Sequence, residues 1–179
     1  MQIDLPGGAR LRPFEESDAE ELFALTDRHR AHLGAWLPWV PFTTSQADSL
    51  EFIRMTRRQL EADEGMQLAL VEADGAIAGV AGFHRFDWQN RATTIGYWLA
   101  ADRQGRGLMT AAVRALVDHA FAERGLHRVE IAAAVGNARS RGVPERLGFR
   151  EEGVRRRAER VGDRYFDLVV YAMLAAEWR

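Results

Sequence analysis

The sequence predicts one α/β (α+β) domain spanning residues 1–179, built on a mixed, mostly antiparallel sheet of about seven strands. Three segments with strand character, 66–72, 76–83 and 91–99, follow one another through short connections, which indicates an antiparallel meander. A further apolar strand at 128–134 comes after a helix, and a strand–helix–strand unit implies that its two strands are parallel. A chain of 179 residues is long enough to bury its own core.

Composition excludes several classes of function. The net charge of −2 gives no case for nucleic-acid binding, and no apolar run approaches the length that spans a membrane. The absence of cysteine excludes disulfides, thiolate metal sites and a cysteine nucleophile. The first twenty residues lack the basic-then-apolar pattern of a signal peptide. We therefore expect a cytoplasmic protein without nucleic-acid or membrane partners.

The N-terminal segment predicts a strand followed by a helix. Residues 9–14 alternate and contain Pro13, which places the strand at a sheet edge. Residues 17–20 read as a capping box that opens a helix running to about residue 30 or 32. His29 and His32 lie three apart on that helix, but no third ligand is near in sequence, so no metal site is expected.

An aromatic loop follows, and its two prolines prevent a regular helix. Trp36 and Trp39 either close the core or form a wall of a substrate cleft, since concave sites favour aromatic linings. A second helix is expected over 46–62, with an arginine-rich side that is more typical of a solvated face. The Asp-Gly pair at 74–75 predicts a hairpin turn. His84, on the next strand, is a candidate proton relay or a rim histidine.

The most informative stretch is a basic glycine turn at 103–107, between a strand and a helix that begins at Leu108. A helix start leaves backbone N–H groups without partners and directs a partial positive charge outward, which suits a phosphate. Two common phosphate motifs fail here, because a P-loop needs Lys-Ser/Thr after Gly107 and a dinucleotide fingerprint needs glycine in place of Thr110. The remaining readings are a different phosphate cradle or a plain strand–helix connection.

The C-terminal third predicts a short helix and two strands. Asn137 is a good cap for a helix that ends before Gly148, with Pro144 weakening it near Ser140. Segments 149–154 and 165–173 read as strands joined by a strongly basic arm around Glu159.

Several motifs, in this order along the chain, resemble one enzyme family. They are Trp36-Leu37-Pro38-Trp39, Gly96-Tyr97-Trp98-Leu99, Gln104-Gly105-Arg106-Gly107-Leu108-Met109, Asn137-Ala138-Arg139-Ser140, the segment 143–149, and the spaced residues Glu159, Gly162, Asp167 and Tyr171. The chain resembles the GNAT N-acetyltransferases, and within them the ribosomal-protein N-terminal acetyltransferases of the RimJ/RimL type. The resemblance implies the GNAT fold, with helices on both faces of the sheet. Met109 stands where the family motif has Gly or Ala.

The resemblance also implies acetyl-CoA as co-substrate and no metal. The residues implied in holding it are Tyr97, Trp98, Leu99, Arg103, Gln104, Gly105, Arg106, Gly107, Leu108, Met109, Thr110 and Asn137. The turn would hold the pyrophosphate, with Arg103 and Arg106 expected to add charge. The strand that contains Tyr97 would diverge from strand 128–134 to admit the pantetheine arm, and Asn137 would bond that arm.

For catalysis, the resemblance points to Ser140 as the proton donor to the leaving thiolate, with the tyrosines ranked behind it. Without the resemblance, Ser140 reads as a helix residue bonding backbone. Glu159 matches a proposed base of this branch, or else it is a surface acid paired with arginines, which are expected to lower its pKa. Trp36, Trp39 and His84 are candidate acceptor contacts.

The sequence therefore predicts an enzyme that moves acetyl from acetyl-CoA to a primary amine by direct attack. A protein N-terminal α-amine is one acceptor. The alternatives are a small amine (a polyamine, an antibiotic or an amino-acid derivative) and an acyl-CoA-binding module without turnover. The expected partner is the amine acceptor, and a homodimer stays open.

Overall fold

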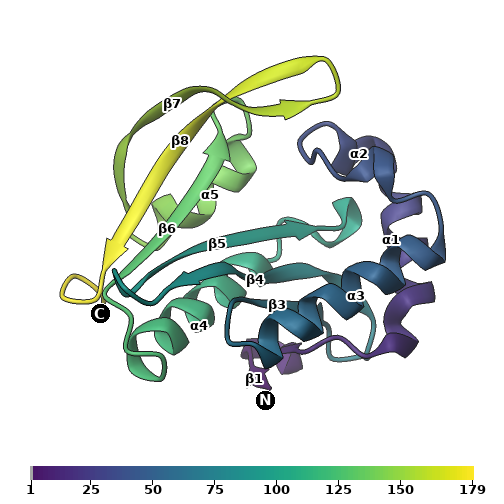
Figure 1. The fold of residues 1–179 in the computed structure, drawn as a ribbon, viewed down its shortest axis with the longest axis horizontal. Helices are drawn as coiled ribbons and strands as arrows, with labels where there is room; N and C mark the ends of the chain where they lie inside the picture. The colour runs from purple at the N-terminus through teal and green to yellow at the C-terminus, as the bar shows by residue number, and fades with distance from the viewer. Residues whose placement is uncertain (1) are drawn as a thin grey trace.

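Eight strands form one mixed sheet in the order β1-β2-β3-β4-β5-β6-β8-β7 in the computed structural model, which describes residues 2–179 (Figure 1). The strands are β1 (Ile3–Asp4), β2 (Arg10–Arg12), β3 (Met66–Val71), β4 (Ile77–Asp87), β5 (Ala92–Leu99), β6 (Arg128–Ala134), β7 (Arg150–Val161) and β8 (Arg164–Leu174). The helices are α1 (Ala19–Arg28), α2 (Arg30–Gly34), α3 (Gln46–Glu61), α4 (Leu108–Ala122) and α5 (Ala138–Arg146), with short 3-10 helices η1 (Pro6–Gly8), η2 (Glu16–Asp18), η3 (Val40–Phe42) and η4 (Ala101–Arg103).

Every neighbouring pair of strands is antiparallel except β5 and β6, which are parallel. This confirms the predicted meander over β3–β4–β5 and the predicted parallel pair around α4. The Asp74-Gly75 turn joins β3 to β4, with Gly75 at a φ of 92°. The sheet is therefore mixed and mostly antiparallel, as the sequence predicts.

Helices cover both faces of the sheet, because successive apolar side chains along a strand point alternately to one face and to the other. In β3, Leu68 and Leu70 join one core cluster with side chains of α4 and α5, whereas Ala69 and Val71 join a second cluster with α1 and α3. Adjacent residues of a strand point to opposite faces, so one strand serves two cores. The central helix α4 buries Ala112, Leu116 and Ala120 among others, which is the predicted apolar stripe.

The N-terminal part differs from the prediction in three ways. The additional strand β1 pairs outside β2, so β2 is not the sheet edge. The capping box uses Glu15 and Asp18 and belongs to η2, because the side chain of Asp18 accepts the N–H of Glu15 at 2.8 Å. The first helix also ends at Arg28, since His29 leaves the helical region (φ −108°, ψ 16°) before α2 begins.

The basic arm is also different from the prediction, because it is the outer half of a long hairpin. β7 and β8 continue through the expected loop and meet at a two-residue turn, Gly162-Asp163, with Val161 opposite Arg164. The end of this hairpin reaches toward α2 (Figure 1). β7 is one of the two edge strands of the sheet and is exposed along most of its length.

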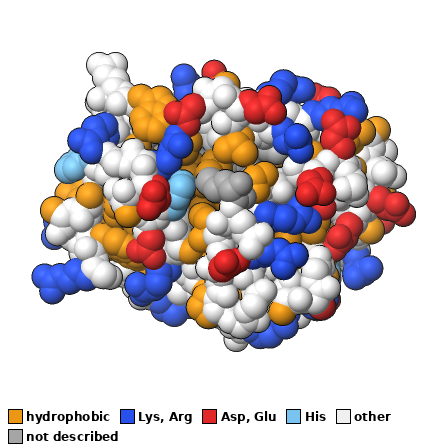
Figure 2. Space-filling model, turned by 90° about the horizontal axis from the view of Figure 1, so that it is seen from below, with side chains coloured by type: hydrophobic (Ala, Val, Ile, Leu, Met, Phe, Trp, Pro, Cys, Tyr) orange, Lys and Arg blue, Asp and Glu red, His pale blue; other side chains and the backbone are white. Residues whose placement is uncertain are grey.

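The surface elsewhere mixes charges of both signs. Seen from below, arginine and carboxylate side chains intermingle over the face of the molecule (Figure 2). Among residues 2–179, no helix is both long and apolar enough to cross a bilayer.

Candidate active site

The two parallel strands β5 and β6 separate after three residue pairs, the last of which joins Thr94 to Glu130. Beyond this point β5 stays paired only with β4, and β6 pairs with β8 on its other side. Within residues 2–179, the β5 edge over Ile95–Leu99 therefore has no strand partner toward β6 (Figure 1). An extended ligand can bond such an edge as an added strand would. This is the divergence that the resemblance implies for the pantetheine arm.

The glycine turn lies where β5 leads through η4 into α4. Gly105 and Gly107 adopt left-handed conformations, with φ of 80° and 74°. A Cβ at either position would meet nothing within 4 Å, so the space above the turn is open. The first helical hydrogen bond runs from the N–H of Ala111 to the carbonyl of Gly107 at 3.0 Å, which leaves the N–H groups of Leu108–Thr110 at an uncovered helix start. This donor set fits a pyrophosphate.

Met109 does not obstruct this cradle. Its side chain is 7% exposed and packs in the core cluster beneath α4. Only its backbone faces the turn, so the departure from Gly or Ala in the family motif leaves the anion site open.

The sequence suggested that Arg103 and Arg106 add positive charge at the turn, but in the structure both are paired within the protein. Both guanidinium groups contact the carboxylate of Glu72, at 2.6 and 3.0 Å. One mostly buried carboxylate therefore offsets part of their charge. Other arginines approach the turn from α5, and Arg146 donates to the hydroxyl of Thr110 at 3.0 Å.

Gln104 stands at the centre of a chain of hydrogen bonds around the turn. Arg139 of α5 donates to its side-chain oxygen. Its amide nitrogen lies 2.9 Å from Nε2 of His32. Because an amide nitrogen can only donate, Nε2 of His32 must accept, which makes Nδ1 the protonated nitrogen. Burial and the nearby charge of Arg139 lower the pKa of His32, which favours this neutral form.

His29 and His32 therefore both contact the segment that leads from β5 into α4. Nε2 of His29 lies 3.3 Å from the carboxylate of Asp102 in η4. Among residues 2–179, no three His, Asp or Glu side chains gather as a metal site would require.

Ser140 and Tyr97 meet across the gap between β5 and β6. The phenol of Tyr97 donates to the backbone carbonyl of Ser140 at 2.8 Å, and the hydroxyl of Ser140 lies 3.4 Å from the phenol oxygen. Asn137 caps α5, because its side-chain oxygen accepts the N–H of Ser140 at 3.1 Å. Burial raises the pKa of Tyr97, so this phenol keeps its proton. The site therefore holds two neighbouring hydroxyl protons.

Glu159 has an environment opposite to the expected one. Within residues 2–179 no guanidinium lies within 4 Å of its carboxylate, and burial raises its pKa. The predicted lowering by arginines is therefore wrong. Glu159 lies opposite Phe166 in the hairpin, and the ring of Phe166 packs on Trp36 with centroids 5.7 Å apart.

The aromatic loop after α2 contacts both sides of the gap. Trp39 packs on Trp98 of β5 at 5.8 Å, and Trp36 lies against Gly136, just before the α5 cap. Both tryptophans are partly exposed, as expected of a wall. The ring of His84 covers Gly96 of β5, and its hydrogen-bond partner is Gln67 at 3.2 Å. Among the described residues, no contact joins it to Ser140 or Glu159.

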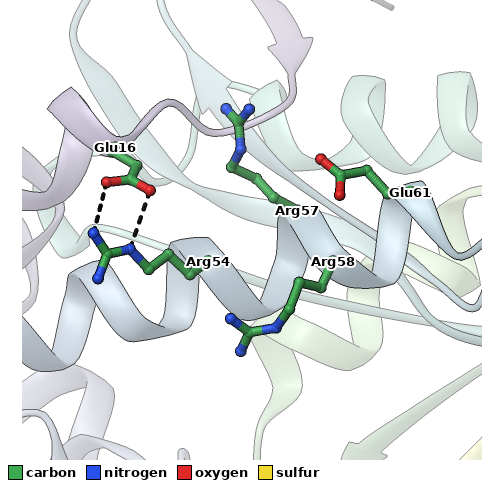
Figure 3. Close-up of a pocket in the computed structure, with 5 residues that line it drawn as sticks. All are labelled: Glu16, Arg54, Arg57, Arg58 and Glu61. Atoms are coloured by element: carbon green, nitrogen blue, oxygen red, sulfur yellow. Dashed lines mark hydrogen bonds and ion pairs between the residues drawn. The ribbon is translucent and has the colours of Figure 1, made fainter.

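The arginine-rich side of α3 is a solvated face, as the sequence favours. Arg54 makes two hydrogen bonds to Glu16 at 2.9 and 3.0 Å (Figure 3). Arg57 donates to the carbonyl of Phe14. Arg58 pairs with Glu51 at 2.9 Å. The groups of this side are thus engaged within the protein.

Sequence reasoning missed His32, Arg139 and Arg146 as residues of the turn. Arg139 and Arg146 are seven residues apart on α5, a spacing that places both on one helical face. This spacing is a signal in the sequence that both arginines approach the same part of the site. His32 lies 72 residues from Gln104, and no local pattern predicts that contact.

Comparisons with known proteins agree with this geometry. The family model described as acetyltransferase (GNAT) domain matches residues 9–150. A protein of Bacillus subtilis (strain 168), provisionally named ribosomal N-acetyltransferase YdaF, is 41% identical over 173 residues, which are 94% of this chain and 92% of that protein.

Two solved structures are similar throughout. RimL, a ribosomal L7/L12 alpha-N-protein acetyltransferase in complex with coenzyme A, is 29% identical with a TM-score of 0.92, covering 97% of this chain and 98% of its own. The microcin C7 self-immunity acetyltransferase MccE, in complex with acetyl-CoA and AMP, is 28% identical with a TM-score of 0.87, covering 94% and 97%. The glycine turn, the diverging strands and these matches together show that the chain belongs to the GNAT family of N-acetyltransferases.

Proposed function

We propose that this N-acetyltransferase transfers acetyl from acetyl-CoA to the α-amine of a protein N-terminus by direct attack. The observation that carries the proposal is the meeting of Ser140 and Tyr97 where β5 and β6 diverge. The two hydroxyl groups are proton donors. The chain has no cysteine that could carry the acetyl group as a thioester, which favours direct attack by the amine. The similarity to a ribosomal-protein acetyltransferase supports a protein acceptor.

Two parts of the site would hold the co-substrate, the start of α4 and the free edge of β5. The N–H groups at the start of α4 would bind the pyrophosphate, and Arg146 would add positive charge beside Thr110. The free edge of β5 over Tyr97–Leu99 would bond the pantetheine amides. The side-chain NH2 of Asn137, which makes no hydrogen bond within residues 2–179, is a further donor.

The chemistry requires one proton to leave the amine and one to reach the thiolate. Acetyl-CoA supplies a thioester whose acetyl carbon accepts the amine while the thiolate leaves. Ser140 is placed to donate a proton to the thiolate, and Tyr97 orients it, because the hydroxyl of Ser140 donates to the phenol oxygen at 3.4 Å and the phenol donates to the carbonyl of Ser140 at 2.8 Å. Glu159, with its raised pKa, is a stronger base than an ordinary surface glutamate. A backbone N–H near Leu99 would stabilise the oxygen that gains charge.

An α-amine suits these groups better than a lysine. Its pKa is about 8, against about 10.4 for lysine, so less help is needed to remove its proton near neutral pH.

The test is release of free CoA thiol with a panel of acceptors: peptides with free N-termini, the same peptides with blocked N-termini and one lysine, spermidine and an aminoglycoside. All 24 basic residues of the enzyme are arginine, so it adds no lysine amine to the background. We expect turnover with free N-termini. Turnover confined to spermidine or the aminoglycoside would contradict the proposal.

A second candidate acceptor is a small amino-acid derivative attached to a nucleotide. It is favoured by the likeness to MccE, a self-immunity enzyme solved with AMP, and by the Trp36–Phe166 pair, which could stack a base. An amino-acid adenylate analogue in the same panel tests it.

A further inference from the structure

Pro144 lies buried inside α5, four residues after Ser140. A helical residue normally donates its backbone N–H to the carbonyl four positions earlier, but proline has no N–H, and its ring crowds that carbonyl. The N–H of Arg141, before the proline, and the N–H of Leu147, after it, do donate to the carbonyls four positions earlier, at 3.0 and 3.2 Å. The proline therefore removes the helical donor of one carbonyl, that of Ser140.

The carbonyl of Ser140 has a donor from outside the helix. The phenol of Tyr97 donates to it at 2.8 Å. Tyr97 lies on β5 beyond Thr94, the last residue of β5 that pairs with β6, so this bond crosses the gap between the two strands. A carbonyl away from water is costly to leave without a donor, and the missing N–H at position 144 therefore favours the bond to Tyr97.

The same helix is also held from the β8 side. Arg141, the residue after Ser140, donates through Nε to the hydroxyl of Tyr171 at 2.9 Å and through Nη1 to the carbonyl of Val135 at 3.2 Å. The hydroxyl of Tyr171 donates in turn to the carboxylate of Glu145 at 2.8 Å, which uses its only proton. Tyr171 thus anchors α5 to β8, while Tyr97 ties it to β5 at Ser140.

We propose that Pro144 is a positioning residue for acetyl transfer: it leaves the carbonyl of Ser140 without a helical donor, so that Tyr97 can fix the place of Ser140 across the gap. The inference deepens the proposed function and rests on it, because Ser140 is the proton donor there. A misplacement of about 1 Å at a reacting group can cost about a hundredfold in rate. With an N–H at position 144, the helix would bond this carbonyl itself, and the tie to Tyr97 would weaken.

The experiment is a double-mutant cycle of Pro144→Ala and Tyr97→Phe. Alanine restores the backbone N–H and favours the helix. The kcat and the KM for acetyl-CoA are measured by thiol release with a peptide that has a free α-amine, the Kd of CoA by calorimetry, and Tm by thermal unfolding. The matched control is Pro6→Ala, at the exposed start of η1, where the missing N–H of proline is ordinary. This control should keep the wild-type values.

The two variants should not act independently. Pro144→Ala should lower kcat about tenfold and leave the Kd of CoA within about twofold of wild type. In the Tyr97→Phe background it should have no further effect on kcat, because it acts through Tyr97. Tyr97→Phe should lower Tm by several degrees in the wild-type background but by less than about half as much in the Pro144→Ala background, where the new N–H bonds the carbonyl of Ser140.

An unchanged kcat in Pro144→Ala, independent losses of kcat in the double variant, or equal losses of Tm in both backgrounds would each overturn the inference. A lower kcat with an equal loss of CoA affinity would also overturn it, because Pro144 would then shape the cofactor site. If no peptide is acetylated, the proposed function fails. Losses of Tm that differ between the two backgrounds would still support the role of Pro144, and equal losses would still reject it.

Discussion

Replacing Gly107 with Asp tests whether the glycine turn binds the pyrophosphate. Gly107 precedes the first residue of α4 and has φ 74° and ψ −1°. A side chain there meets no protein atom within 4 Å, so it projects into the space assigned to the ligand. A carboxylate about 4 Å from a phosphate charge raises the free energy by ~4 kcal/mol at an effective dielectric constant of about 20.

That energy corresponds to about a thousandfold increase in Kd for CoA. The matched control is Gly107→Asn, which has nearly the same shape but no charge. A non-glycine residue in the left-handed region costs ~1–2 kcal/mol, and asparagine tolerates this region better than most residues. We therefore expect the Asn variant to lose a few degrees of Tm and less than about tenfold in affinity.

The assay is calorimetric titration of CoA into both variants, with thermal unfolding as the check on folding. An Asp variant that binds CoA within threefold of wild type would refute the assignment of the turn. Equal losses of CoA affinity in both variants would refute the electrostatic explanation, because side-chain bulk or backbone strain would then explain the loss.

Three further predictions concern the other parts of the site. Ser140→Ala and Tyr97→Phe should each lower kcat by about a hundredfold while leaving the Kd of CoA unchanged, because proton transfer typically contributes 10²–10⁴-fold; unchanged kcat in both would return these hydroxyls to a structural role. Glu159→Gln should remove the fall of kcat/KM at low pH, which is the acid limb of its pH profile. In wild type that limb should lie above the usual glutamate pKa of about 4.3, since burial raises the pKa of Glu159, and an identical profile in the variant would exclude Glu159 as base. His32 has a lowered pKa in the folded protein, so its neutral form stabilises the turn above pH ~6.5 and that contribution is lost as pH falls further. His32→Asn should weaken CoA binding and flatten this acid dependence between pH 5 and 7, which titrations at several pH values would show.

Features set by local chemistry could be predicted from the sequence. The Asn137 cap, the Asp74-Gly75 turn and the strand at 128–134 each depend on residues within a few positions, and the structure confirms all three. The glycine turn belongs to the same group, because left-handed backbone at Gly105 and Gly107 requires no partner distant in sequence.

Features set by tertiary contacts could not be predicted. Glu72 captures Arg103 and Arg106 from another strand, and His32 reaches Gln104 across the fold. The error on Glu159 has the same origin. Its neighbours in sequence are arginines, but a bulge in β7 between Arg155 and Glu159 displaces them and burial beside Phe166 controls its pKa. The closeness of Glu159 to arginines in the sequence predicted an ion pair, and the register of β7 against β8 prevents that pair from forming.

The most direct test of the central claim is thiol release from acetyl-CoA with one matched pair of peptides. One peptide has a free α-amine and no lysine, and the other has a blocked N-terminus and a single lysine. We expect the first peptide to be acetylated at its N-terminus, as mass spectrometry would confirm, and the second to remain unmodified. Acetylation of the lysine peptide alone, or CoA binding without release on either, would contradict the central claim.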